Sequence, residues 1–184
     1  VIMEFGVWWG ANLALFESIR AIYEPYNYTR QVIGFDTFSG YPSNSPKDGR
    51  SSLAEVGGYR TTENYDEYLK QILEYHQSEN AMSHIKKYRI VKGDASITVK
   101  KYLNEHPETI IALAYFDLQL YEPTKKSLQA IKPFLTKGSL IAMDELNSRE
   151  FPGETLAFKE VFGLTRFRLF KSQFLPDRTY LIID

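Results

Sequence analysis

The sequence contains no cysteine and only three histidines, His76, His84 and His106. The missing thiols exclude a disulfide framework, a thiolate nucleophile and a cysteine-ligated zinc site. The histidines stand in polar segments and lack the spacing of metal ligands, so solvated side chains are expected there. A chain without cysteine is compatible with a reducing compartment, and we expect a cytoplasmic protein.

An excess of charge of either sign is also missing, as is a long apolar run. Lys and Arg number 22, and Asp and Glu number 23, which gives a formal net charge of −1. Because no basic stripe is present, counterion release gives little drive for binding nucleic acid. The longest apolar runs, such as 110–116, fall far short of the roughly 20 residues that span a membrane. We therefore expect no nucleic-acid partner and no membrane segment.

The length of 184 residues fits one domain over 1–184. A domain of this size buries roughly 70% of its unfolded surface, which is enough for a core without disulfides. The first residue, Val1, already lies in an apolar stretch, and neither an initial Met nor a signal peptide precedes it. We expect that an N-terminal lid segment is missing from this chain.

Short apolar runs alternate with helical patterns, which is typical of a parallel sheet flanked by helices. Predicted strands cover 1–6, 31–36, 88–93, 109–117 and 138–144, and predicted helices cover 11–24, 62–77, 96–104, 123–135 and 154–162. A terminal pair, 166–172 and 178–184, predicts an antiparallel hairpin. The segment 39–62 is rich in glycine, proline and serine, and its length indicates a binding loop or a lid. The predicted fold class is α/β, a mostly parallel sheet with helices on both faces.

The first predicted strand runs into EFGVWWG, a glycine-bearing turn before a helix, which is the usual start of a nucleotide-binding domain. Dinucleotide sites need G-x-G-x-x-G, so that backbone N–H groups can approach the pyrophosphate. Here Val7, Trp8 and Trp9 separate Gly6 from Gly10. This loop is bulkier and more apolar than a phosphate cradle, and it favours a ligand without phosphates.

Acidic residues gather where the predicted strands end, and ligands of open α/β sheets bind beyond the carboxyl ends of the strands. The acids at or near these ends are Glu4, Asp36, Asp94, Asp117, Asp144 and Glu145. Each one alone is explained equally well by a helix cap or a turn, and Asp94 is the best candidate for a plain cap. Together they require a cationic or hydroxyl-rich partner.

Asp36 ends the second predicted strand, where an acid accepts hydrogen bonds from the ribose hydroxyls of a nucleoside. A ribose acid without a phosphate cradle suggests S-adenosylmethionine, whose sulfonium and ammonium groups suit acids and an aromatic face such as Trp8. The alternative for Trp8 and Trp9 is ordinary packing at the start of the first helix.

Six segments resemble the macrocin O-methyltransferase family in order and spacing: EFGVWWG, GFDTFSGYP, VKGD, YFDLQLYEPTKKSL, GSLIAMDELN and FPGETLAF. The resemblance extends from the first residue to about Leu164. It implies a Rossmann-like methyltransferase fold, S-adenosylmethionine as cofactor, a small-molecule sugar or glycoside as acceptor, and a magnesium ion beside the acceptor hydroxyl. A homo-oligomeric state is the remaining expectation about partners.

The resemblance also implies roles for particular residues. The cofactor-binding residues would be Glu4, Gly6, Trp8, Gly10, Asp36, Thr37 and Asp94. The residues facing the metal and the acceptor would be Asp117, Gln119, Asp144 and Glu145, with Phe151 and Glu154 bordering the acceptor pocket. Such an all-oxygen set suits magnesium or calcium better than zinc.

Gln119 departs from the D-x-D pattern that the resemblance leads one to expect, because this chain has Asp117-Leu118-Gln119. Two residues apart in an extended segment, Asp117 and Gln119 point the same way. Glutamine keeps a carbonyl oxygen but carries no charge, which weakens the attraction for a cation. We therefore expect this site to bind magnesium with reduced affinity or to bind no ion. Asp117 is the predicted catalytic residue, and without an ion it would act as a metal-free general base.

The leading interpretation is an S-adenosylmethionine-dependent O-methyltransferase acting on a glycosyl hydroxyl with the assistance of magnesium. Two alternatives stay open. A catalytically silent domain that binds cofactor or glycan is compatible with the uncharged Gln119. An NAD-dependent sugar-modifying enzyme is disfavoured by the missing third glycine and by the lack of a suitably placed Tyr-x-x-x-Lys pair.

Overall fold

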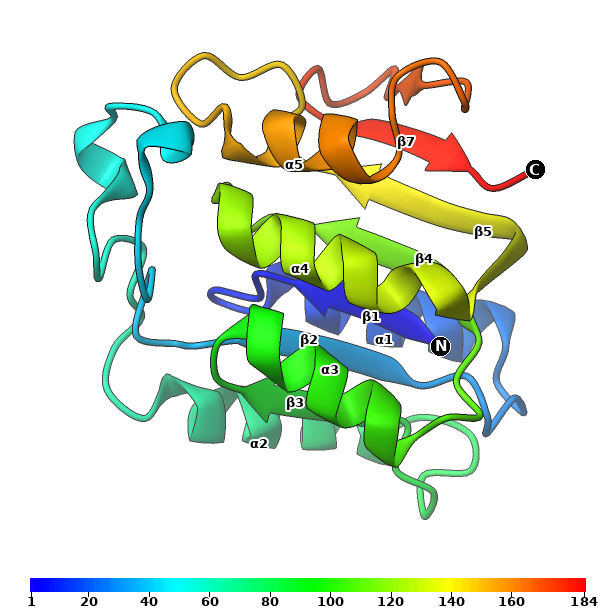
Figure 1. Cartoon of the computed structure of the whole chain (residues 1–184). Helices are drawn as coiled ribbons and strands as arrows, with labels where there is room; N and C mark the ends of the chain where they lie inside the picture. The colour runs from blue at the N-terminus through cyan, green and yellow to red at the C-terminus, as the bar shows by residue number, and fades with distance from the viewer.

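The structure is a computed structural model that describes residues 1–184, and it consists of one sheet with helices on both faces (Figure 1). The strands are β1 (Ile2–Phe5), β2 (Val32–Asp36), β3 (Tyr88–Lys92), β4 (Ile111–Phe116), β5 (Leu135–Met143), β6 (Phe170–Lys171) and β7 (Thr179–Ile182). The helices are α1 (Ala11–Tyr23), α2 (Tyr65–Ser78), α3 (Ala95–Glu105), α4 (Tyr121–Ile131) and α5 (Gly153–Val161). Three short 3₁₀ helices cover Pro46–Asp48, Ser52–Ala54 and Lys132–Phe134.

The seven strands follow the order β3-β2-β1-β4-β5-β7-β6, so that β3 and the two-residue β6 form the edges. Strands β1 to β5 are parallel, whereas β7 runs antiparallel to both β5 and β6. The predicted mostly parallel sheet with a terminal antiparallel hairpin is therefore confirmed. Strand order reverses between β1 and β4, and at such a switch point the carboxyl ends leave a crevice for a ligand.

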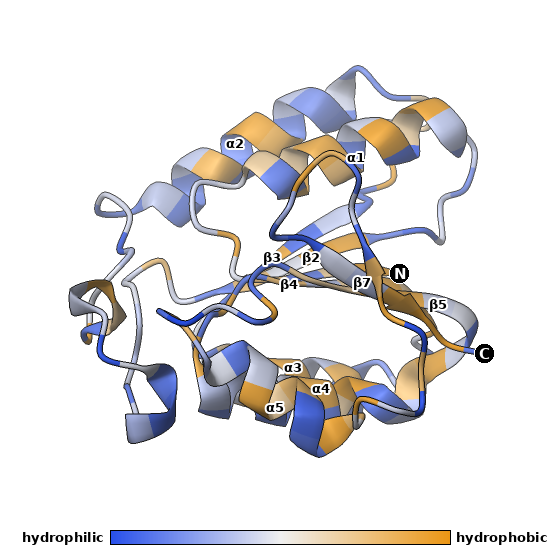
Figure 2. Cartoon of the chain, turned by 90° about the horizontal axis from the view of Figure 1, so that it is seen from above, coloured by the Kyte–Doolittle hydropathy of each residue, from blue (hydrophilic) through white to orange (hydrophobic).

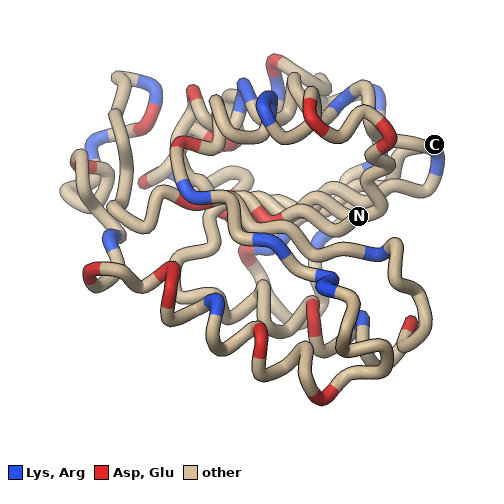
Figure 3. The backbone as a smooth tube through the Cα atoms, turned by 90° about the horizontal axis from the view of Figure 1, so that it is seen from below, with Lys and Arg blue, Asp and Glu red and all other residues tan.

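The helices form two layers, with α1 and α2 on one face of the sheet and α3, α4 and α5 on the other (Figure 2). Basic and acidic residues are interspersed along the backbone without a long run of one sign, which agrees with the near-neutral composition (Figure 3). None of the helices combines the length and the apolar character that crossing a bilayer requires.

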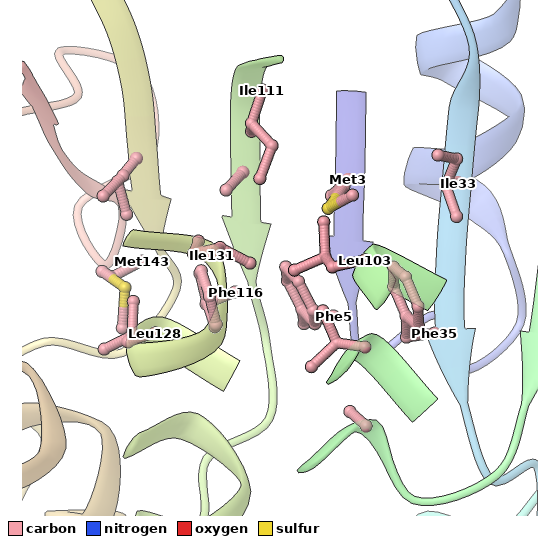
Figure 4. Close-up of a cluster of buried hydrophobic side chains, with 14 of the residues drawn as sticks. Met3, Phe5, Ile33, Phe35, Leu103, Ile111, Phe116, Leu128, Ile131 and Met143 are labelled. Atoms are coloured by element: carbon pink, nitrogen blue, oxygen red, sulfur yellow. The ribbon is translucent and has the colours of Figure 1, made fainter. Parts of the chain in front are cut away.

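The larger core lies between the sheet and helices α3 to α5 (Figure 4). Phe5 pairs with Phe35 on one side and Phe116 on the other, with ring centroids 5.0 Å and 4.4 Å apart. Stacked aromatic pairs of this kind add roughly 0.5–1.5 kcal/mol each beyond their buried area. The stack fixes the register of β1, β2 and β4, and with it the positions at which these three strands end.

Helix α4 begins and ends earlier than the predicted 123–135. The N–H of Tyr121 donates to Asp48 Oδ1 over 2.5 Å, which supplies a cap two residues before Pro123. Pro123 is tolerated because the first turn of a helix has free N–H groups. The α-helix ends at Ile131 and passes directly into the 3₁₀ helix Lys132–Phe134, because Pro133 has no N–H to continue the α-helical hydrogen bonds; β5 then begins at Leu135 instead of 138.

A buried ion pair within α1 is hydrogen-bonded to Asn80, two residues after α2 ends. Glu17 and Arg20 join over 2.8 Å with both side chains fully buried, and the side-chain amide of Asn80 donates to Glu17 over 3.1 Å. The outer face of α1 is apolar, with Leu15 and Ile22 exposed. Helix α1 thus keeps its charges inside, opposite to the usual amphipathic arrangement.

Candidate functional site

A cavity of about 270 Å³ opens beyond the carboxyl ends of β1, β2 and β4. The segment 39–62, cyan in Figure 1, lies at this end of the sheet. Among the predicted cofactor-binding residues, Gly6, Trp8, Asp36, Thr37 and Asp94 line the cavity, and among the predicted metal ligands Asp117, Gln119 and Asp144 do. Glu4, Gly10 and Glu145 do not line it. The strand-end acids therefore converge as the sheet topology predicts, with two exceptions, Glu4 and Glu145.

Gly6 allows the ends of β1 and β4 to meet. Its φ is +88°, and a Cβ at this position would lie 2.0 Å from the carbonyl oxygen of Asp117. A side chain cannot be accommodated there unless the β4 backbone moves. Because it has no side chain, Gly6 lets the loop after β1 pack directly against the segment that carries Asp117.

Gly10 has a structural task. It caps α1 in the left-handed conformation with φ +77°, and its N–H donates to the carbonyl of Val7 over 2.8 Å. A Cβ there would lie 2.4 Å from the side chain of Leu69 on α2. The glycine serves the turn and the approach of two helices, and a direct contact with cofactor stays a prediction.

Asp36 organises the loops after β1 and β2. Its Oδ2 accepts the N–H groups of Val7 and Trp8 over 2.7 Å and 2.8 Å, and its Oδ1 accepts that of Phe38 over 2.6 Å. A carboxylate offers about four acceptor positions, so roughly one remains for a ligand hydroxyl. Thr37 beside it uses its hydroxyl within the turn, donating to the carbonyl of Gly40 over 2.6 Å.

Trp8 and Trp9 differ in their surroundings. Trp8 is 47% exposed, lines the cavity and has a left-handed φ of 50°. Trp9 instead contacts the ring of Tyr65 at the start of α2, with centroids 4.7 Å apart. Ordinary packing therefore accounts for Trp9, whereas Trp8 faces the place where a ligand would lie.

Asp94 caps α3, as predicted, because its Oδ1 accepts the N–H of Ser96 over 2.8 Å. Its side chain also borders the cavity. Glu4 is buried behind the loop, and its Oε2 has no hydrogen-bond partner. Burial, with a smaller contribution from Asp117, raises the pKa of Glu4 well above its usual range.

Asp117 and Asp144 form an acid pair at the floor of the cavity. Asp144 contacts Arg178 in an ion pair and accepts the hydroxyl of Tyr115 over 3.2 Å. Burial, followed by the neighbouring Asp144 and then Glu154, raises the pKa of Asp117 to about 8. At neutral pH the pair therefore tends to hold one proton, with Asp117 as its site. Arg178 comes from the C-terminal hairpin, and no local pattern marked it as a site residue.

The predicted four-ligand magnesium site is not supported by this arrangement. The amide nitrogen of Gln119 donates to Asp117 Oδ1 over 3.3 Å, so that its nitrogen and not its oxygen faces the acid. Arg178 already neutralises Asp144, and Glu145 lies outside the cavity lining. No group of three or more His, Asp or Glu side chains is placed to hold a metal ion. The donor set is chemically suitable for magnesium, but as arranged it does not fit.

Aromatic residues form one wall of the cavity. Tyr59 contacts Trp8 and Tyr41 with centroids 5.8 Å and 5.5 Å apart, and it reaches Phe151 at 6.4 Å. Tyr41 and Tyr59 come from the 39–62 segment, which supports its prediction as a binding loop. Trp8, Tyr59 and Gln119 all have left-handed backbone and all line this cavity. Such strain concentrates at functional sites.

The predicted place of Glu154 at the border of the acceptor pocket is wrong. Glu154 is fully buried and does not line the cavity. Its carboxylate instead accepts backbone N–H groups from the segments after β4 and β5. Phe151 does reach the aromatic wall through Tyr59.

Solved structures similar to this chain include two of CalS11. One, described as a calicheamicin methyltransferase, is 44% identical with a TM-score of 0.96, and the match covers 98% of this chain and 71% of that one. An apo structure, described as a TDP-rhamnose 3′-O-methyltransferase, is 42% identical with a TM-score of 0.85, covering 98% of this chain and 70% of that one.

The O-methyltransferase NovP has a TM-score of 0.72 at 18% identity, with coverage of 99% and 71%, and it supports the fold alone. No protein-family model matches the chain, and no match was found among curated proteins. The identity to CalS11 and the extent of that match agree with the resemblance carried by the six sequence segments. The chain belongs to the family of S-adenosylmethionine-dependent sugar O-methyltransferases.

Proposed function

We propose that this protein transfers a methyl group from S-adenosylmethionine to a hydroxyl of a nucleotide-linked sugar or related glycoside, with Asp117 as the general base. The observation that carries the proposal is the single cavity in which Asp117 lies next to the β1 and β2 loops. The description of CalS11 as a TDP-rhamnose 3′-O-methyltransferase supports a sugar acceptor. A cytoplasmic location and a homo-oligomeric state remain predictions.

We assign the residues that line the cavity to a cofactor side and an acceptor side, with the contact between Trp8 and Tyr59 at their boundary. On one side, Asp36, Asp94 and Trp8 offer two acids and an aromatic face, which suit a ribose, an adenine amine and a sulfonium. On the other side, Asp117 and Tyr59 face the space left for an acceptor ring. The cofactor-side residues fit S-adenosylmethionine, which has no phosphate and needs no phosphate cradle.

Bound S-adenosylmethionine supplies an electrophilic methyl group on a positively charged sulfur. The chain must hold an acceptor hydroxyl in line with that methyl group and remove its proton. In its ionised form, Asp117 would accept the proton of that hydroxyl, and the methyl group supplied by the cofactor would take the proton's place on the oxygen. A base with a pKa of about 8 is close to the operating pH, which is the useful range for general catalysis.

The direct test is turnover of a panel of TDP-sugars, including TDP-rhamnose, with S-adenosylmethionine. Mass spectrometry should show one methylated sugar for each S-adenosylhomocysteine formed. Cofactor binding in calorimetry without any methylated product would support the alternative of a catalytically silent binder, which the uncharged Gln119 keeps open. Binding of NAD in place of S-adenosylmethionine would contradict both.

Asp36→Ala is expected to weaken S-adenosylmethionine binding by about 1–3 kcal/mol, because the ribose loses an acceptor and the N–H groups of Val7 and Trp8 lose theirs. Isothermal titration of the cofactor measures the change. Asp48→Ala is the matched control, since Asp48 also accepts backbone N–H groups but lies outside the cavity lining. Equal affinity in the wild type and in Asp36→Ala would remove Asp36 from the cofactor site.

Magnesium assistance remains a prediction, and no step above depends on it. Gln119→Asp is expected to tighten magnesium binding at least about tenfold, because a unit charge about 4 Å from an ion contributes on the order of a few kcal/mol. Isothermal titration with magnesium, at a saturating cofactor concentration, compares this variant with the wild type and with Gln119→Asn. Asparagine has the same length as aspartate but carries no charge. Similar magnesium affinities in all three proteins would show that no ion binds at this position.

A further inference from the structure

Glu154 is a buried acid that the proposed mechanism does not use. It lies in the first turn of α5, its exposure is 0%, and it is absent from the cavity lining. A buried carboxylate is costly unless its oxygens are well hydrogen-bonded. The hydrogen-bond partners of the Glu154 carboxylate therefore indicate what this buried acid does at the start of α5.

All of its hydrogen-bond partners are backbone groups of the two acid-bearing segments. Glu154 Oε1 accepts the N–H of Leu118 over 2.9 Å and that of Gln119 over 3.2 Å. Oε2 accepts the N–H of Glu145 over 3.3 Å. Leu118 directly follows Asp117, and Glu145 directly follows Asp144. One carboxylate thus connects the backbone next to both acids of the cavity.

The surrounding contacts make this connection specific. The segment after β4 is strained, because Gln119 has a left-handed φ of 62°. Backbone in this conformation persists only when its surroundings hold it. A Cβ on Gly153 would lie 2.6 Å from the carbonyl oxygen of Gln119, so the start of α5 is pressed against the same segment. Glu154 is therefore placed to hold a conformation that the chain would not keep unaided.

We propose that Glu154 is a positioning residue that fixes Asp117 and Asp144 relative to each other on the acceptor side of the cavity. The inference rests on the proposed function for its kinetic consequence. The cofactor side depends on a different carboxylate, since Asp36 holds Val7 and Trp8. Loss of Glu154 should therefore affect turnover and leave cofactor affinity in place.

Two variants of Glu154 and one control test the proposal. Glu154→Gln keeps the shape and one carbonyl oxygen, whereas Glu154→Ala removes all three hydrogen bonds. Glu17→Gln is the matched control, because Glu17 is equally buried but pairs with Arg20 away from the cavity. Misplacement of a catalytic group by about 1 Å costs on the order of 100-fold in rate. We expect kcat to fall at least about tenfold in Glu154→Gln and further in Glu154→Ala, with cofactor Kd changed less than about threefold.

Amide hydrogen exchange provides a readout that does not need turnover. The N–H groups of Leu118, Gln119 and Glu145 should lose protection in both Glu154 variants, while those of Val7 and Trp8 keep theirs. Unchanged protection at the first three positions would overturn the proposal, even if the wild type has no activity on the sugars tried. A parallel loss of cofactor affinity and turnover would also overturn it, and if Glu154→Ala does not fold, Glu154→Gln decides.

Discussion

Asp117→Asn is expected to lower kcat by about 10²- to 10⁴-fold, because the acceptor hydroxyl loses the group that removes its proton. Asparagine keeps the size of the side chain, so the effect should come from chemistry and not from packing. Single-turnover methyl transfer with saturating S-adenosylmethionine measures it directly. Cofactor affinity should stay within about threefold, since Asp117 belongs to the acceptor side of the cavity.

The dependence of methyl-transfer activity on pH provides a second test of Asp117 as the general base. Burial raises the pKa of Asp117 to about 8, so the wild type should gain activity as pH rises toward that value and Asp117 loses its proton. The residual activity of Asp117→Asn should lack this rise. Asp66→Asn is a suitable control, since Asp66 is also buried but pairs with Lys92 outside the cavity. Nearly normal turnover in Asp117→Asn would require another base.

Gly6→Ala is expected to reduce both stability and turnover. The added Cβ would lie 2.0 Å from the carbonyl oxygen of Asp117, and this backbone atom, directly after the central strand β4, cannot move aside cheaply. Overpacking typically costs about 1–3 kcal/mol, and a left-handed non-glycine residue costs roughly 1–2 kcal/mol more. Urea denaturation should therefore show a loss of about 2–5 kcal/mol in the free energy of unfolding.

Gly138→Ala separates these two contributions. Gly138 has the same φ of +88°, but nothing lies within 4 Å of the position its Cβ would take. Its alanine variant should lose only the conformational part, about 1–2 kcal/mol, and retain turnover. If both variants lose the same stability and Gly6→Ala remains active, the close approach of β1 and β4 does not constrain the site.

The fold was largely predictable because its strands and helices have different hydrophobic periods. The predicted helix boundaries were wrong where a residue distant in sequence determines them. Asp48 caps the start of α4 from another segment, and no sequence pattern near Tyr121 indicates this cap. The acid cluster was predictable in outline, since parallel strands bring their carboxyl ends to one edge. Arg178 was not, because only the tertiary pairing of β7 with β5 brings it to Asp144.

The predicted metal set is not supported by the arrangement of its residues, and the reason is local. β5 ends at Met143, and Asp144 lies in the bend that follows it, next to Glu145. Glu145 lies outside the cavity lining. Asp117 and Gln119 would point the same way on extended backbone, but Gln119 is left-handed, and its amide nitrogen donates to Asp117. Periodicity alone does not reveal such a change of backbone.

The two edges of the sheet bear on how this protein behaves at high concentration. An exposed edge strand offers unpaired N–H and C=O groups to other chains, and long uncharged edges promote aggregation. Here β6 has only two residues, one of them the exposed Lys171, and β3 carries the exposed Arg89 and Lys92. Neither edge is long and uncharged enough to template an intermolecular sheet, so we expect this protein to resist edge-to-edge association at high concentration.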